Sequence, residues 1–235
     1  MALNIVYEDE NIIVVRKSAG IATQTSKPYE KDMVSELRKH LKGALVYVVH
    51  RLDQPVEGLL VFAKDKQSAA LLSKSVASKD EDDSFIKDYT AVVLSKEKLV
   101  GMRLENLIVK TKDRLAKVYN TSSRECSDAK YAVLDFEVID EKEILVSDVI
   151  YYVTEICVHL QTGRFHQIRA QLSHASLPIL GDKKYGTEES KRISDELGIR
   201  QVLLSADKLS FTHPKTKKKM EFTGNSEVIK RVLNK

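Results

Sequence analysis

Short apolar and polar blocks alternate at the start of the chain. Ile5–Tyr7 and Ile12–Val15 are apolar, and they flank the polar stretch Glu8–Asn11. Apolar runs separated by a polar turn are typical of paired strands. The pattern therefore predicts a β-hairpin as the first element.

Apolar residues recur at helical spacing in two later segments. One runs from Met33 to Leu41 and ends before Gly43, a residue typical of helix ends. In the other, Asp65 is placed to cap a helix that continues through Leu72 and Val76. We expect both helices to pack on a sheet.

Strands outnumber helices in the rest of the predicted structure. Runs rich in Val, Ile, Tyr and Phe predict strands at 44–49, 59–63, 85–94, 104–109, 130–139, 149–160 and 202–211. Helices are expected at 166–174, at 188–197 and from Glu227 onward, with a mobile polar connection at 74–84. The elements do not alternate as in a doubly wound fold.

Length and composition indicate one catalytic unit in an intracellular protein. The 235 residues are 43% hydrophobic and 31% charged, and no apolar run approaches the roughly 20 residues that span a bilayer. No secretory signal precedes the first strand, so we expect a cytoplasmic protein without membrane attachment. Cys126 and Cys157 are too far apart for a thiolate metal site, and we expect both to be reduced.

The charge pattern permits a polyanionic partner without requiring one. The formal net charge is +4, with basic segments at Lys110–Lys117 and Lys215–Lys219 and an acidic one at Lys79–Asp83. These runs are consistent with a one-sided positive surface, although solvated loops explain them equally well.

Several common chemistries are disfavoured. Gly181–Thr187 lacks the lysine of a phosphate-binding loop, and no Gly-x-Ser-x-Gly occurs in the chain. His159, His166 and His174 are not spaced to place two imidazoles one helical turn apart, so we expect no metal.

Two polar blocks contain the candidate chemistry. In the first, Asp53 lies in a segment held between the apolar runs 44–49 and 59–63. In the second, Arg164 precedes a predicted helix on which His166 and Arg169 share one face, a patch suited to phosphate. Taken alone, Asp53 could cap a turn, and the second block could simply cap a helix.

Together these blocks resemble the RluA-type family of RNA pseudouridine synthases. The matching segments are Tyr7–Glu10, His50–Asp53, Gly58–Lys64, Lys87–Ala91, Thr162–Arg169, Gly181–Gly186 and Leu209–Pro214. The resemblance therefore extends over almost the whole chain. It implies an α+β fold with a mixed, largely antiparallel central sheet in two halves flanked by helices, and no cofactor.

The resemblance also implies the reaction and its residues. Uridine in structured RNA, ribosomal or transfer, is converted to pseudouridine, with Asp53 as the catalytic carboxylate. Asp53 either attacks the anomeric carbon or removes a ribose proton. Arg169 is the expected ion-pair partner of Asp53, and Tyr89 is expected to stack on the target base.

The resemblance and general chemistry assign the remaining candidates to RNA. Arg51 is expected to hold the flipped nucleotide. His50 is expected to orient the loop, and Arg164, His166 and Gln167 to shape the pocket or contact RNA.

Departures from the family pattern leave alternatives open. Ser18 replaces a proline, and Val56-Glu57 replaces Thr-Ser. Glu57 places a second carboxylate near Asp53, and a pair of carboxylates is typical of enzymes that hydrolyse glycosides. We hypothesise that Glu57 instead faces outward and takes no part in the reaction. The competing hypothesis is a catalytically silent RNA-binding or RNA-folding factor. We expect residues 1–235 to form a single catalytic domain, monomeric, without a separate N-terminal RNA-binding domain.

Overall fold

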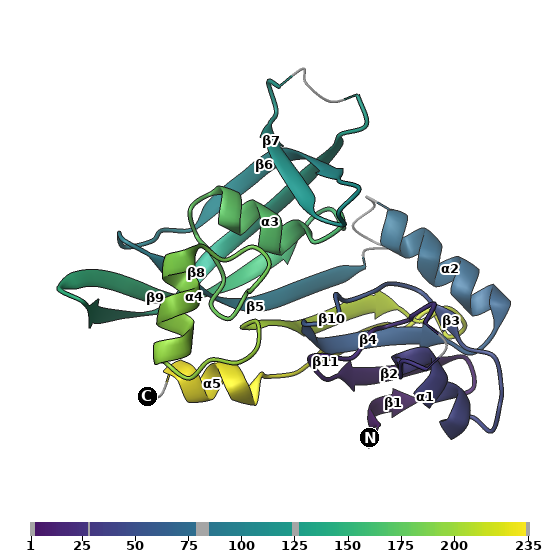
Figure 1. Cartoon of the computed structure of the whole chain (residues 1–235). Helices are drawn as coiled ribbons and strands as arrows, with labels where there is room; N and C mark the ends of the chain where they lie inside the picture. Colours follow the sequence, from purple (N-terminus) through teal and green to yellow (C-terminus); the bar gives the residue numbers. More distant parts are fainter. Residues whose placement is uncertain (1–2, 28, 79–84, 124–126, 234–235) are drawn as a thin grey trace. The chain divides into compact units, whose positions relative to one another are not determined.

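The computed structural model describes residues 3–27, 29–78, 85–123 and 127–233 (Figure 1). The chain forms two compact units. Unit 1 contains Met1–Lys87 and Ser205–Ser226, and unit 2 contains Asp88–Leu204 and Glu227–Lys235. Each unit contains one half of a mixed, largely antiparallel sheet with helices, so the protein is α+β as expected.

The half-sheet of unit 1 has the strand order β1-β2-β4-β10, with β3 paired to β4 and β11 paired to β10. Its pairs are antiparallel except for the parallel pair β4–β10. The strands are β1 (Asn4–Glu8), β2 (Ile12–Lys17), β3 (Tyr47–Val48), β4 (Glu57–Ala63), β10 (Leu204–Thr212) and β11 (Lys219–Thr223).

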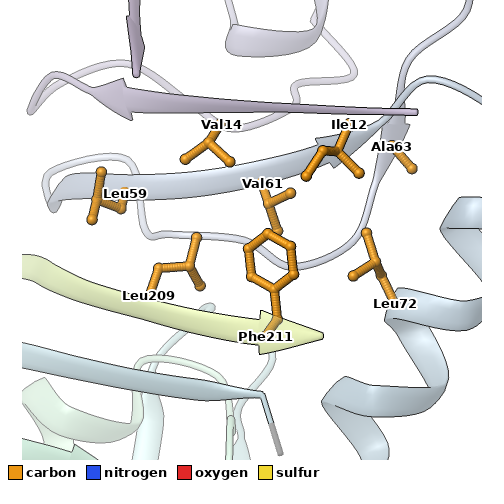
Figure 2. Packing of buried hydrophobic residues seen from close by; sticks show 8 residues of the cluster. All are labelled: Ile12, Val14, Leu59, Val61, Ala63, Leu72, Leu209 and Phe211. Carbon is orange, nitrogen blue, oxygen red and sulfur yellow. The ribbon is translucent and has the colours of Figure 1, made fainter. Parts of the chain in front are cut away.

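Helices α1 (Met33–His40) and α2 (Lys66–Ala77) belong to unit 1, and both begin at an aspartate cap. Asp65 accepts the backbone N–H of Ser68 at 2.8 Å, as the sequence predicts. Apolar side chains from β2, β4, β10 and α2 converge in one core cluster (Figure 2). Leu72 joins α2 to this cluster, so burial of an apolar face fixes the helix on the strands.

The half-sheet of unit 2 is antiparallel, with the order β5-β9-β8-β6-β7. Its strands are β5 (Ile86–Ser95), β6 (Met102–Lys110), β7 (Ala116–Asn120), β8 (Lys130–Val146) and β9 (Val149–Leu160). Its helices are α3 (Gln167–His174), α4 (Glu188–Glu196) and α5 (Glu227–Leu233). Helix α3 packs on β6 and β7 (Figure 1). Ala170 of α3 shares a core cluster with Ile108 of β6, Ala116 of β7 and Ala132 of β8.

Strand β8 is longer than expected and has only one described neighbour along its second half. It pairs with β6 from Lys130 to Phe136, and with β9 as far as Val146. The sequence pattern predicted an end near residue 139, because several charged residues follow there. The turn to β9 places Ser147 and Asp148 at positive φ, the geometry of a tight hairpin.

The N-terminal hairpin and all five helices are confirmed, but some element predictions were wrong. The run 44–49 forms only the two-residue β3, and Leu45 is exposed. Strands β7 and β11 were missed because each has only five residues and too few apolar ones to form a run. The expected connection 74–84 is helical through Ala77, and residues 79–84 lie outside the described residues.

None of the helices in the described ranges is long and apolar enough to cross a membrane.

Candidate active site

The loop that contains Asp53 connects β3 to β4, and several hydrogen bonds hold it in place. The N–H of Leu52 donates to the Thr23 hydroxyl oxygen at 3.1 Å, and that hydroxyl donates to the Leu52 carbonyl at 3.0 Å. The Val56 N–H donates to the Asp53 carbonyl at 3.1 Å, which closes a turn. Asp53 is half-buried, whereas Arg51 is exposed.

A buried lysine lies beneath this loop. Lys17 has no exposed surface, and its ammonium donates to the carbonyls of Ser18, Ile21 and Gln54 at 3.1, 2.8 and 3.2 Å. Burial lowers the pKa of Lys17 to about 8, although the negative charges of Asp53 and Glu57 act in the opposite direction. Lys17 therefore links the backbone of the loop to the electrostatics of Asp53.

Glu57 does not face outward, so that hypothesis was wrong. It is the first residue of β4, and its side chain is only 15% exposed. Its carboxylate lies 3.8 Å from the guanidinium of Arg16, which also contacts Asp207 at 3.3 Å. The parallel β4–β10 pairing brings these groups together, because Glu57 is in register with Ser205. Whether Glu57 takes part in the reaction stays untested.

His50 is buried at the start of the loop. Its Nε2 accepts the N–H of Val61 at 3.3 Å, which ties the loop to β4. Burial, assisted by the charge of Lys87, lowers the pKa of His50 well below its ordinary value. The imidazole is therefore neutral and structurally fixed at neutral pH, as expected for a residue that orients the loop.

In unit 2, Tyr89 is buried in β5 opposite Val158 of β9. The neighbouring Asp88 points to the other face, as successive strand residues do. There it lies 2.9 Å from Nδ1 of its register partner His159.

Hydrogen bonds of the Gln167 side chain fix the start of α3. The amide of Gln167 donates to the Val133 carbonyl at 3.0 Å. Its oxygen accepts the Thr162 hydroxyl at 2.8 Å and the Arg164 N–H at 2.9 Å. Gln167 is only 3% exposed, so its amide forms hydrogen bonds inside the protein, whereas the side chain of Arg164 is exposed.

Arg169 is held by a carboxylate that the sequence analysis did not single out. Its Nε and Nη2 donate to the two oxygens of Asp182 at 2.7 and 2.8 Å, and both side chains are almost fully buried. Burial alone would raise the pKa of Asp182. Hydrogen bonds from Arg169 and from the N–H groups of Tyr185 and Lys184 outweigh it and leave the pKa below its ordinary value.

Tyr185 contacts both His166 and Arg169, although His166 precedes α3 and is not on its face. The Arg169 guanidinium lies 5.0 Å from the Tyr185 ring centroid, and His166 Nδ1 lies 2.7 Å from the Tyr185 hydroxyl. That hydroxyl oxygen also accepts the Ala116 N–H from β7 at 2.7 Å. His166 has a φ of 51° just before α3, a strained conformation that this hydrogen bond helps to hold.

The candidate residues are thus distributed over both units. Unit 1 contains His50, Arg51 and Asp53, and unit 2 contains Tyr89, Arg164, His166, Gln167 and Arg169. The expected Asp53–Arg169 ion pair would join the two units and stays a prediction. Sequence reasoning missed Lys17, Asp182 and Tyr185. The available signals were the Arg16–Gly20 segment for Lys17 and the matching segment Gly181–Gly186 for the other two.

Within the described residues, no group of His, Cys, Asp and Glu is placed to hold a metal ion.

Comparisons with known proteins identify the family. The family described as RNA pseudouridylate synthase matches residues 11–174. The tRNA pseudouridine synthase C of Pasteurella multocida is 31% identical over 226 residues, which cover 94% of this chain and 90% of that protein. The ribosomal large subunit pseudouridine synthase C of Buchnera aphidicola is 28% identical, covering 98% and 70%.

A solved human structure has the same fold. It is titled RNA Pseudouridylate Synthase Domain Containing 1 and superimposes with a TM-score of 0.74 at 20% identity, covering 98% of this chain and 86% of that one. The chain therefore belongs to the RNA pseudouridylate synthase family and is an enzyme that isomerises uridine to pseudouridine.

Proposed function

We propose that this enzyme modifies specific uridines in structured tRNA or rRNA, with Asp53 as the catalytic carboxylate. The observation that carries the assignment is the loop itself. It presents a half-buried carboxylate from a turn that is fastened by Thr23 and supported by the buried ammonium of Lys17. Such fixing of a reactive group reduces the reorganisation needed to reach the transition state.

Asp53 begins the reaction by one of two routes. As a nucleophile it attacks C1′ of the ribose, and the electron pair of the glycosidic bond leaves with uracil. As a base it removes the proton from C2′, and loss of uracil then gives a glycal. In both routes the uracil then rotates and C5 bonds to C1′. In the first route this breaks the ester bond between Asp53 and C1′, and in the second the proton held by Asp53 returns to C2′. The proton on C5 is then released to solvent.

The other candidates support this step. Arg169 is proposed to pair with Asp53 while Asp182 holds its guanidinium in place, and Tyr89 to stack on the uracil. Arg51 is exposed on the same loop as Asp53, so it is available to fill the space that a flipped nucleotide leaves. His50 and Gln167 hold the backbone, whereas Arg164 and His166 are proposed to contact RNA.

The β6–β7 hairpin supports an RNA partner. Its segment Lys110–Lys117 has four cationic residues and one carboxylate. Lys110, Lys112 and Arg114 are exposed, and none forms an ion pair with a described residue. Unpaired cations are the groups that displace counterions from phosphates. The names of the relatives from Pasteurella and Buchnera make tRNA and rRNA the RNA classes to test.

We also propose that the enzyme acts as a cytoplasmic monomer and that the whole chain forms one catalytic domain.

The test is tritium release from RNA that contains [5-³H]uridine, using unmodified tRNA and large-subunit rRNA transcripts. The wild-type chain should release tritium, and the modified nucleoside should be pseudouridine. Asp53→Asn should lower the rate by at least about a hundredfold. Glu57→Gln should retain most of the activity, provided that its melting temperature shows a folded protein.

Three results would contradict the proposal. Binding of RNA without any change in its nucleosides would indicate the silent RNA-binding factor. Release of free uracil would indicate a hydrolase. Loss of turnover in Glu57→Gln but not in Asp53→Asn would move the catalytic role to Glu57.

A further inference from the structure

His50 has a buried hydrogen-bond donor without an acceptor. Because Nε2 accepts the Val61 N–H, the proton of the neutral ring must be on Nδ1. The residue is 8% exposed, and Nδ1 is buried without a hydrogen-bond partner in the structure as described. Buried donors in folded proteins are almost always paired, so this one indicates an acceptor that the described residues do not provide.

A cation that has no counterion among the described residues lies beside this imidazole. The ammonium of Lys87 is 5.7 Å from the centroid of the Phe85 ring, and the His50 ring is 5.1 Å from the same ring, edge to face. Lys87 is half-buried, and none of the described carboxylates lies within ion-pair distance of it. A desolvated ammonium in that situation favours a bound anion.

The two groups are close enough to influence each other. The positive charge of Lys87 lowers the pKa of His50, and burial lowers the pKa of Lys87. His50 Nδ1 and Lys87 Nζ are both donors, and neither of these two atoms can accept a hydrogen bond in these protonation states. An anion with several oxygens satisfies both, contacting the ammonium directly and Nδ1 directly or through one ordered water.

We propose that His50 Nδ1 and Lys87 Nζ form a phosphate subsite that holds a backbone phosphate of the RNA. The inference rests on the proposed function for the source of the phosphate, but not for the anion chemistry of the site. His50 belongs to the same loop as Asp53, and Lys87 to the same strand as Tyr89. A phosphate held there anchors the nucleotide next to the two segments proposed to act on it.

Imidazole NMR tests the subsite without relying on activity. The full chain is labelled with ¹⁵N-histidine, and His50→Gln identifies one of the six histidine signals. His50 should appear as the neutral tautomer with the proton on Nδ1. Millimolar inorganic phosphate should shift the Nδ1 signal, whereas sodium chloride at the same ionic strength should not. Lys87→Met should abolish the phosphate-dependent shift, and Lys98→Met, at an exposed lysine, should retain it.

Kinetics then connect the subsite to RNA. Lys87→Met should raise KM for RNA about tenfold, with most of the loss in KM rather than kcat, because the lost contact is a charged hydrogen bond. Lys87→Arg should restore much of the affinity. A structural defect alone would lower the melting temperature and would not be rescued by arginine.

The remaining outcomes distinguish failure of the phosphate subsite from failure of the proposed function. No phosphate-dependent change at His50 in an active enzyme overturns the subsite and leaves the proposed function intact. A phosphate-dependent shift in a protein that makes no pseudouridine supports the anion site and overturns the proposed function. An unchanged KM in a folded Lys87→Met variant overturns the assignment of the subsite to RNA.

Discussion

Lys17 shows how one buried side chain can couple stability to pH. Its pKa is lowered from 10.5 to about 8 in the folded protein, chiefly by burial. Between these values the unfolded chain holds more protons than the folded chain. The contribution of Lys17 to the free energy of unfolding must therefore rise with pH across this interval. Below pH 8 the full cost of burying the charge is present.

Replacing Lys17 with methionine should remove this dependence. The unfolding free energy of the wild type minus that of Lys17→Met should increase between pH 8 and 10, by at most about 1.4 kcal/mol per pH unit. Urea unfolding at several pH values measures it. In Asp53→Asn the rise should begin at lower pH, because the carboxylate that raises the pKa of Lys17 is lost. A constant difference from pH 7 to 10 would contradict the argument.

The sequence located the polar blocks but not the partners within them. Asp53 and Arg169 could be singled out because the segments that contain them, His50–Asp53 and Thr162–Arg169, resemble the motifs of a known family. Asp182 and Tyr185 support Arg169 from a different loop, and such tertiary contacts leave no spacing signal. Gln167 reads as a surface amide next to Arg164, and only the packing of α3 on the sheet makes it interior.

At the scale of elements, β4 passes unusually close to β10 at Gly58. Its φ is +129°, and a Cβ atom there would lie 2.4 Å from the backbone N and O of Ala206. Arg16 of β2 contacts both Glu57 of β4 and Asp207 of β10 next to this point, which holds the two strands together. Glycine is therefore required by both conformation and space.

Gly58→Ala should destabilise the protein by more than about 3 kcal/mol, because a backbone clash adds to the strained φ. The matched control is Gly43→Ala. Gly43 has a φ of +92° with nothing within 4 Å of the added Cβ, so it isolates the conformational cost of about 1 kcal/mol. Thermal or urea unfolding compares the two. Equal losses would show that the clash is relieved by movement of β10.

The elements were predictable where apolar residues alternate or recur, as in β1, β2 and α1. They were not predictable at β7 and β11, each of which is the last strand on one side of its half-sheet. Such strands have one unpaired side and tolerate charged residues, and each of these two strands has only five residues, too few for a clear apolar run. The basic segment Lys215–Lys219, which a solvated loop also explained, ends in a strand, because Lys219 begins β11.

At the scale of the whole molecule, the free cations of the β6–β7 hairpin should determine how RNA binding responds to salt. Lys112→Gln with Arg114→Gln should reduce the slope of log K against log salt by up to about 2, since each phosphate contact contributes about 0.9. Filter binding at salt concentrations between about 50 and 200 mM, where such effects are large, measures the slope.

The matched control removes two cations that are already paired. Lys191 contacts Glu188 and Arg200 contacts Asp195, each at 2.8 Å. The double variant Lys191→Gln, Arg200→Gln changes net charge by the same amount and should leave the slope almost unchanged. Equal effects of the two double variants would mean that net charge, not the hairpin, controls binding.

The second half of β8 has a consequence for concentrated solutions of this protein. Beyond Phe136 its outer backbone groups could template a strand from another molecule, and Ile139 and Leu145 are 58% and 69% exposed there. The same stretch contains the carboxylates of Glu137, Asp140, Glu141 and Glu143. Two such edges brought together would place like charges side by side. With one cation, Lys142, the stretch keeps a net negative charge, so mutual repulsion opposes the pairing of two such edges.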